Sequence, residues 1–303
     1  MAVLVVRTGG LGDCLLTLPV VRASAQAHPG SPVHVLGNPT MGEVARMTGR
    51  IAGFHSIDRV AFARLFSSSR PDKFLTSFFS RYYHVYFFSS TGSPDVLART
   101  VTDAGAGSCR VLDPRPPAGF GSHIADHLIE ILPAEIRPPF DAVRPAGVLD
   151  FPVVEAKREG AVIHPGSGGV RKNWPLDRYC MVADALGEGV TFVLGPAEIE
   201  RGMVKSLAGG RYPVETPVSI GDLARILAHS SVFIGNDSGV AHLAAMTDTP
   251  VVVLYGPTDP VIWRPVGERV VQVISPDGNM TGITVDEVLE EIRRIRGSGI
   301  CAV

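Results

Sequence analysis

Short, almost uninterrupted apolar runs alternate with helix-like stretches along the whole chain, and this alternation is its most constraining feature. Each run has the length of a strand and is apolar at consecutive positions, which indicates that both of its faces are buried. Strands of this kind, each followed by a helix, are typical of parallel sheets covered by helices on both sides. The pattern therefore predicts an α/β fold with doubly wound sheets. The clearest runs are AVLVV (2–6), PVHVLG (32–37), YHVYFFSS (83–90), GAVIHPG (160–166), VTFVLG (190–195), SVFIGN (231–236) and PVVVLYG (250–256).

The alternation stops between residues 133 and 160, where the chain carries five prolines and few periodic apolar positions. Such a stretch is typical of a linker between domains. A chain of 303 residues is long enough for two α/β domains. We therefore expect two Rossmann-like domains, residues 1–150 and 151–303, that face each other across a cleft. Ligands of such sheets bind beyond the carboxyl ends of the strands, so the loops that follow the strands should carry the function.

Composition argues against several classes of function. The 28 Lys and Arg residues and the 30 Asp and Glu residues give a net charge of −2, so no overall basic field favours nucleic acid. The four cysteines are scattered and no Cys or His spacing resembles a zinc site, so we expect no bound metal. Unpaired cysteines and the lack of an apolar run long enough to span a bilayer favour a cytoplasmic protein.

The first of the loops after a strand is TGGLGD. Gly9, Gly10 and Gly12 allow a tight turn and a close approach of the backbone to a ligand. Leu15 stands where a dinucleotide-binding G-x-G-x-x-G motif has its third glycine, which disfavours a nicotinamide-dependent oxidoreductase. Asp13 has two interpretations that remain open at this point. It is either a helix-start residue favoured by the helix dipole or a carboxylate held at the mouth of the cleft.

The loop HPGSGGVRKNWP (164–175) combines small residues with a hydroxyl and a mobile cation. Its backbone amides, Ser167 and Lys172 would suit the oxygens of a phosphate, and the alternative is a solvated surface loop. In the next loop, LGPAEIERG, Glu198 and Glu200 follow the end of a strand. These carboxylates either add negative charge to a helix start or accept hydrogen bonds from ribose hydroxyls.

The motif FIGNDSGVAHLAA places Asn-Asp-Ser-Gly between a strand and a helix. The start of a helix is an anion site because its first amides have no partner within the helix. Asp237 or Ser238 could instead cap the helix, and His242 could be a core residue. Next to a second glycine-rich loop with a lysine, this helix start predicts a diphosphate site. Its candidate donors are the backbone amides of Ser238, Gly239 and Val240.

Taken in order, these motifs resemble those of glycosyltransferase family 9, the ADP-heptose–lipopolysaccharide heptosyltransferases. The resemblance rests on VLVVRTGGLGD, IHPGSGGVRKNWP and FIGNDSGVAHLAAMTDTPVVVLYGPTDP, and it covers most of the chain. It implies a GT-B fold with an acceptor-binding N-terminal domain and a C-terminal domain that binds the nucleotide sugar. The last helix could pack back on the N-terminal domain. The implied reaction is an inverting transfer of a heptose, or a related sugar, from an ADP-sugar to a hydroxyl of a lipopolysaccharide core or another surface glycan.

The resemblance also implies roles for single residues. Asp13 would be the general base that takes the proton from the acceptor hydroxyl, and the glycines of the TGGLGD loop would leave room for two sugars. Glu200, rather than Glu198, would hold the ribose, and residues 214–220 would line the base pocket. No metal or other cofactor is implied, since the ADP-sugar is a co-substrate. The remaining donor-binding residues would be Ser167, Gly168, Lys172, Asp237, Ser238, Gly239, Val240 and His242.

The chain departs from the family pattern at one phosphate contact and on the acceptor side. Gly168 stands where close relatives carry a hydroxyl residue, and the chain is shorter than most members. Residues 64–84 combine cations with aromatic side chains, which predicts either a mobile acceptor loop near a membrane or a solvated helix with a core face. The expected partners are a nucleotide sugar and a glycan or glycolipid acceptor, met in the cytoplasm or at the inner face of the cytoplasmic membrane. The cations are Arg64, Arg70, Lys73 and Arg81.

Two alternatives keep the fold and change the function. A GT-B nucleotide-sugar epimerase would need a second set of acid and base groups placed for the sugar itself, and the motifs do not supply one clearly. A non-catalytic protein that binds a nucleotide sugar would have no use for a base at Asp13.

Overall fold

The computed structural model describes residues 1–47, 49, 51–66, 70–90, 92–137, 158–207 and 211–297. The chain divides into two compact units, Met1–Asp150 and Phe151–Val303. Each unit holds one parallel β-sheet, which is the expected α/β class. Most of the expected linker, residues 138–157, lies outside the described residues.

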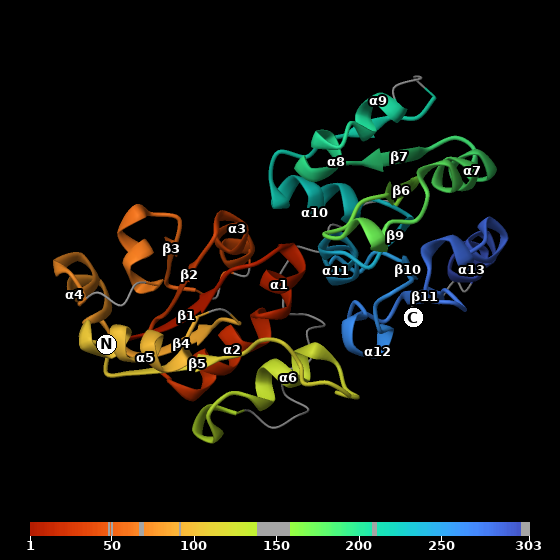
Figure 1. The fold of residues 1–303 in the computed structure, drawn as a ribbon. Coiled ribbons are helices and arrows are strands. Elements are labelled where there is room, and N and C mark those ends of the chain that lie inside the picture. Colours follow the sequence, from red (N-terminus) through yellow and green to blue (C-terminus); the bar gives the residue numbers. More distant parts are fainter. Residues whose placement is uncertain are drawn as a thin grey trace. The chain divides into compact units, whose positions relative to one another are not determined.

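The first unit is built on a five-stranded sheet with the order β3-β2-β1-β4-β5 (Figure 1). Every pair of neighbouring strands is parallel, and the chain winds outward from the central β1 in both directions. The third strand was not expected from the sequence, because its four residues are half-buried and contain no apolar run. The strands are β1 (Ala2–Arg7), β2 (Val33–Gly37), β3 (Gly53–Ser56), β4 (Tyr82–Phe88) and β5 (Ser108–Leu112).

Helical segments cover this sheet, and one face packs on η1, α4 and α5 through a cluster that includes Leu4, Phe79 and Val101. The expected long helix after Asp13 is divided at Thr17. Pro19 explains the division, because it has no N–H with which to continue the helical hydrogen bonds. The segments are α1 (Leu11–Leu16), α2 (Leu18–Ala27), α3 (Pro39–Met47), η1 (Val60–Phe66), α4 (Lys73–Phe79), α5 (Pro94–Asp103), α6 (Ile124–Glu130) and η2 (Ala134–Ile136).

The basic and aromatic segment 64–84 spans the end of η1, the whole of α4 and the start of β4. Among its described residues, Phe78 is buried in the core, and the guanidinium of Arg81 lies 4.8 Å from the centre of that ring. Arg64 forms an exposed ion pair with Asp72 at 3.0 Å. The described part of the segment therefore has a core face and a solvated face, and a role in acceptor binding stays a prediction.

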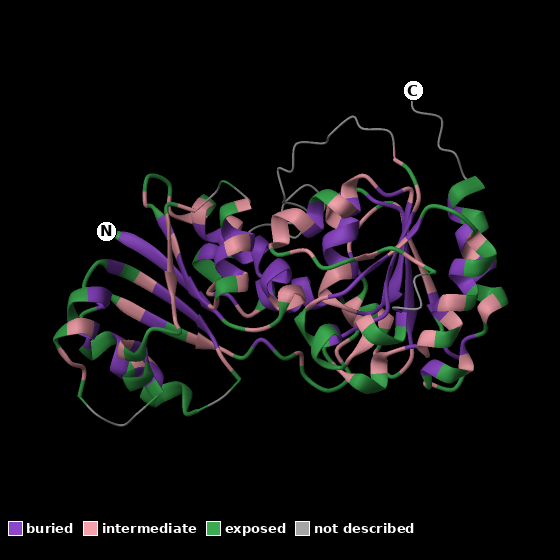
Figure 2. Ribbon diagram, turned by 90° about the horizontal axis from the view of Figure 1, so that it is seen from above, coloured by how far each residue is buried: buried purple, intermediate pink, exposed green. Residues whose placement is uncertain are grey.

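The second unit is built on a six-stranded sheet with the order β11-β10-β9-β6-β7-β8. All of these strands also pair in parallel. The central strands are buried along their whole length, and Figure 2 shows them in purple. This burial on both faces is what the continuous apolar runs predict. The strands are β6 (Ala161–His164), β7 (Val190–Val193), β8 (Val214–Glu215), β9 (Val232–Asn236), β10 (Val251–Tyr255) and β11 (Val270–Ile274).

One face of this sheet packs against α7, α9 and α13 in a single apolar cluster that includes Phe192 and Ile234. The last helix, α13, buries its apolar side on this cluster, and its expected contact with the first unit stays a prediction. The other helices follow the strands that carry the candidate loops. The segments are η4 (Val170–Lys172), α7 (Leu176–Leu186), α8 (Pro196–Glu200), α9 (Met203–Leu207), α10 (Ile220–Ala228), α11 (Gly239–Met246), α12 (Pro260–Trp263), η5 (Met280–Gly282) and α13 (Val285–Gly297).

We expect Phe192→Ala to lower the free energy of unfolding by about 3–5 kcal/mol, since this fully buried ring fills the cluster beneath α7 and α13. Urea unfolding followed by circular dichroism measures the loss. Met181→Ala is the control, because Met181 lies on α7 with its side chain exposed, and its change should stay within about 0.5 kcal/mol. Equal losses in the two variants would contradict the assignment of this core.

Candidate functional site

The loop after β1 holds Asp13 by both of its carboxylate oxygens. Arg7, the last residue of β1, donates from Nη2 to Asp13 Oδ1 at 2.7 Å, and the Gly10 amide donates to Oδ2 at 3.0 Å. The Arg7 side chain is buried, whereas that of Asp13 is 43% exposed. The two interpretations of Asp13 are thus compatible, because it stands in the first turn of α1 and still reaches solvent.

Two neighbours of Asp13 restrict the chemistry of this loop. Gly9 has a φ of 141°, and a Cβ atom there would lie 2.6 Å from Asp13 Oδ2, so only glycine fits. Burial, with the nearby charge of Asp13, raises the pKa of Cys14 to about 12. A thiol of that pKa is not a nucleophile at neutral pH, which leaves the Asp13 carboxylate as the exposed reactive group of the turn.

In the glycine-rich loop after β6, the hydroxyl of Ser167 makes its contacts within the loop itself. Ser167 Oγ lies 2.6 Å from Asn173 Oδ1 and 2.8 Å from the Gly169 carbonyl oxygen, and Ser167 is buried. A phosphate oxygen would therefore compete with these partners for the hydroxyl. Gly168 is exposed, and a Cβ atom there would meet open space. Contact of either residue with a donor stays a prediction.

Lys172 and Asp237, from two loops 65 residues apart in sequence, meet directly. Lys172 Nζ lies 2.8 Å from Asp237 Oδ2. Asp237 is only 6% exposed, so its charge depends on this lysine for compensation. The sequence names both residues as candidates and contains no signal that they pair.

At the helix start next to Asp237 the structure shows a serine cap, and anion binding there stays a prediction. Ser238 caps α11, with its hydroxyl 3.5 Å from the Ala241 amide. Gly239 and Val240 form the first turn and are half-buried. His242 is buried in the same helix. The structure thus brings Lys172, Asp237 and the start of α11 together at the carboxyl ends of β6 and β9, which lie side by side.

The two glutamates that follow β7 differ in exposure to solvent. Glu198 is 4% exposed, accepts a hydrogen bond from the Gly195 amide at 3.0 Å, and lies 3.6 Å from His164 Nε2. Burial alone would raise the pKa of Glu198, but the hydrogen bond and charge of His164 and the Gly195 amide outweigh it, and the pKa is lowered. Glu200 is exposed at the end of α8, so it is the accessible carboxylate of the pair. Ribose binding by Glu200 stays a prediction.

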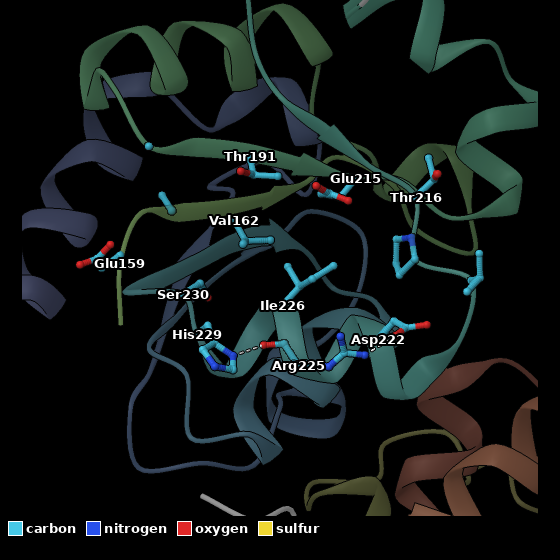
Figure 3. Close-up of a pocket in the computed structure, with 14 residues that line it drawn as sticks. Glu159, Val162, Thr191, Glu215, Thr216, Asp222, Arg225, Ile226, His229 and Ser230 are labelled. Carbon is cyan, nitrogen blue, oxygen red and sulfur yellow. Dashed lines mark hydrogen bonds and ion pairs between the residues drawn. The ribbon is translucent and has the colours of Figure 1, made fainter. Parts of the chain in front are cut away.

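The second unit contains a cavity of about 610 Å³ between the sheet and α10 (Figure 3). Val162 and Thr191 line it from the strands, and Ile226 points into it from α10. Four of the residues expected to form the base pocket, 215–218, line one end. The other end is lined by Glu159, Gly189 and Ser230, which lie at the amino ends of the strands. Only the 215–218 end therefore lies near the candidate loops.

Sequence reasoning missed three polar residues that hold these loops in place: Arg7, His164 and Asn236. Each is the last residue of a buried strand, where a polar side chain is a usable signal because apolar residues precede it. Among the residues that the structure describes, no three His, Cys, Asp or Glu side chains gather as a metal site. No helix within the described ranges is long and apolar enough to cross a membrane.

Comparison with known proteins gives a family model and curated relatives that agree. The model of glycosyltransferase family 9 (heptosyltransferase) matches residues 133–291. Lipopolysaccharide heptosyltransferase 3 of Escherichia coli (strain K12) is 35% identical over 122 residues, which is 37% of this chain and 35% of that protein. The alignments with these curated relatives span 28–39% of their length.

Solved structures extend the likeness to the whole fold. The E. coli ADP-heptose lps heptosyltransferase II matches with a TM-score of 0.76 and 18% identity over 98% of both chains. The E. coli heptosyltransferase WaaC with ADP matches with a TM-score of 0.71 and 22% identity over 97% of this chain and all of that one. The expected GT-B fold, with two parallel-sheet α/β domains, is confirmed.

We expect Gly166→Ala to destabilise the second unit, because the new Cβ would lie 2.0 Å from the buried Glu198 Oε1. Displacing a buried carboxylate from its hydrogen bond should cost about 1–3 kcal/mol of unfolding free energy. Gly168→Ala is the matched control two residues away, with no atom within 4 Å of its Cβ. Urea unfolding that shows the same stability for both variants would disprove this packing of Glu198.

Proposed function

Because this chain belongs to glycosyltransferase family 9, we propose that it is an inverting glycosyltransferase. It moves a heptose, or a related sugar, from an ADP-sugar to a hydroxyl of a lipopolysaccharide core or another surface glycan. The observation that carries the proposal is the meeting of Lys172 and Asp237 at the start of α11. That arrangement offers a cation and helix-start amides to a diphosphate at the carboxyl edge of a doubly wound sheet.

The second unit would bind the donor through its diphosphate. The side chain of Lys172 is 34% exposed, so its ammonium can also meet a phosphate oxygen while it stays paired with Asp237. The amides of Gly239 and Val240 and the backbone around Gly168 would share the remaining charge. In the transfer these groups stabilise the departing diphosphate, which is the main electrostatic demand of the reaction.

The rest of the donor would lie along the same edge. Asp237 and His242 would contact the donor sugar or the diphosphate, and Glu200 would accept hydrogen bonds from the ribose hydroxyls. Residues 215–218 would contact the base at the near end of the cavity, whose volume is in the range of small-molecule sites. The exposure of Glu200 supports its choice over Glu198, whose carboxylate is already used inside the unit.

The first unit would bind the acceptor and supply the base. The acceptor oxygen attacks the anomeric carbon, the bond from that carbon to the diphosphate oxygen breaks, and the hydroxyl proton passes to Asp13. A single displacement inverts the anomeric centre and needs no covalent intermediate with the protein. Arg7 and Gly10 fix the carboxylate for this step, and the exposed part of Asp13 receives the proton.

The acceptor and the place of the reaction are part of the same proposal. A glycan or glycolipid is the acceptor, and the basic face of residues 64–84 would meet its anionic groups or the inner face of the cytoplasmic membrane. The protein would act in the cytoplasm or at that surface. The reaction as written includes no metal ion, and the ammonium of Lys172 and the backbone amides would stabilise the diphosphate.

Asp13→Asn should lower the rate of transfer about 10²–10⁴-fold and leave the affinity for ADP unchanged. The amide keeps the shape of the side chain and cannot accept the proton. Calorimetry gives the affinity, and a transfer assay with ADP-heptose gives the rate. Asp95→Asn is the control, since Asp95 stands in the first turn of α5 with no proposed chemical role. Transfer at the wild-type rate by Asp13→Asn would remove the base assignment.

Lys172→Ala should weaken ADP binding about tenfold or more and leave adenosine binding nearly unchanged, because the phosphates are the part of the ligand that the ammonium would contact. The comparison is made by calorimetry, with and without Mg²⁺, and includes UDP, GDP and NAD with the wild-type protein. Arg171→Ala controls for general charge, since Arg171 is the exposed neighbouring cation. Equal weakening of ADP and adenosine would place Lys172 away from the phosphates, and wild-type preference for UDP or GDP would change the donor.

A further inference from the structure

One buried side chain, Asn236 at the end of β9, joins both ends of the glycine-rich loop to the sheet. Its Nδ2 donates to the Pro165 carbonyl at 2.8 Å and to the Gly166 carbonyl at 3.3 Å. Its Oδ1 accepts from the Trp174 amide at 3.0 Å and from the Tyr179 hydroxyl at 2.9 Å. Asn236 is 0% exposed. The primary amide thus uses two donors and two acceptor positions, which is its full capacity.

The position of these partners gives the bonds a consequence beyond stability. Pro165, Gly166 and Trp174 are the two ends of the segment that carries Ser167 and Lys172. Between the ends, the Ser167 hydroxyl lies within hydrogen-bond distance of Asn173 and Gly169 and closes the segment on itself. A segment anchored at both ends and closed in the middle has few ways to move on its own.

The next residue of the chain completes the arrangement. Asp237 follows Asn236 and holds the ammonium of Lys172 at 2.8 Å. The end of β9 therefore holds the loop in two ways. Asn236 fixes the loop backbone, and Asp237 fixes the ammonium of Lys172. Asparagine is required for this, because no other uncharged side chain of its size offers two N–H donors and an acceptor on one rigid plane.

We propose that Asn236 is a positioning residue for the donor diphosphate and acts by holding the loop 165–174 so that Lys172 and the loop amides face the phosphates. The inference rests on the proposed function, since it concerns the same donor site. Asn236 itself touches no ligand. Its contribution is the pre-formed geometry of the loop, which spares the bound state the entropy cost of ordering that loop.

The test replaces the two donors and keeps the shape. Asn236→Asp puts an oxygen where Nδ2 faces two carbonyl oxygens, so the anchors at Pro165 and Gly166 are lost. Tyr179→Phe is the matched control, because it removes a bond to the same amide from α7 and leaves both ends of the loop attached. Circular dichroism checks that each variant is folded, and calorimetry measures the affinities for ADP and adenosine.

We expect Asn236→Asp to bind ADP about tenfold more weakly or worse, with adenosine affinity changed by less than about threefold. Tyr179→Phe should keep the ADP affinity of the wild type even where it lowers the melting temperature. The double variant with Lys172→Ala should bind ADP no more weakly than the poorer single variant, because both changes remove one contribution. If Asn236→Asp does not fold, Asn236→Ser, whose hydroxyl can satisfy one of the four partners, is measured against the same control.

Two results would overturn the inference while the proposed function stands: ADP affinity like that of the wild type in the folded Asn236 variant, or equal loss of ADP and adenosine affinity. Fully additive losses with Lys172→Ala would also count against it. Absence of ADP binding by the wild-type protein is a different failure, because it removes the proposed function and the inference with it.

Discussion

The parallel pairing of fully buried strands is the constraint on which the rest of this structure depends. A strand buried on both faces has no room for chemistry along its length, so reactive side chains are confined to its end. Asp13 follows β1, the glycine-rich loop follows β6, Glu198 and Glu200 follow β7, and Asp237 follows β9. The parallel direction brings the last three of these strand ends to one edge of the second sheet.

Much of this architecture could be predicted from the sequence, for a physical reason. Apolar runs such as 251–255 admit few structures other than a buried strand, and the glycine-rich loops after such runs mark the ligand edge. The half-buried β3 carries no such run and could not be found. Nor could the interruption of the helix at Thr17, where Pro19 removes one hydrogen bond, be separated from a continuous helix by periodicity alone.

Individual roles at the site were harder to predict, because they depend on contacts between residues distant in sequence. Glu198 and Glu200 are equivalent in sequence, yet two positions along a helix turn a side chain to nearly the opposite face, and only burial separates them. The sequence predicts Lys172 and Asp237 as donor-binding residues and gives no signal that they pair. The sequence gives no sign that Asn236 anchors the loop after β6, where it bonds the backbone of Pro165 and Trp174.

In each unit the charge with a proposed function is held by an opposite charge in the absence of ligand. Asp237 is buried and needs Lys172, and Arg7 is buried and needs Asp13. In both pairs the more exposed member, Lys172 or Asp13, has a proposed role toward the phosphates or the acceptor, and its buried partner holds it in position. Burial of an unpaired charge is costly, so neither pair can open fully unless another charge takes the place of the partner.

A diphosphate bound at Lys172 would share the ammonium with Asp237. Because Asp237 is buried, this arrangement favours a ligand that binds without moving the lysine away from it. Arg7 and the Gly10 amide hold both carboxylate oxygens of Asp13, so the proposed base has a fixed position before an acceptor arrives. A fixed position of the carboxylate is therefore what the Arg7 contact contributes to the proposed reaction.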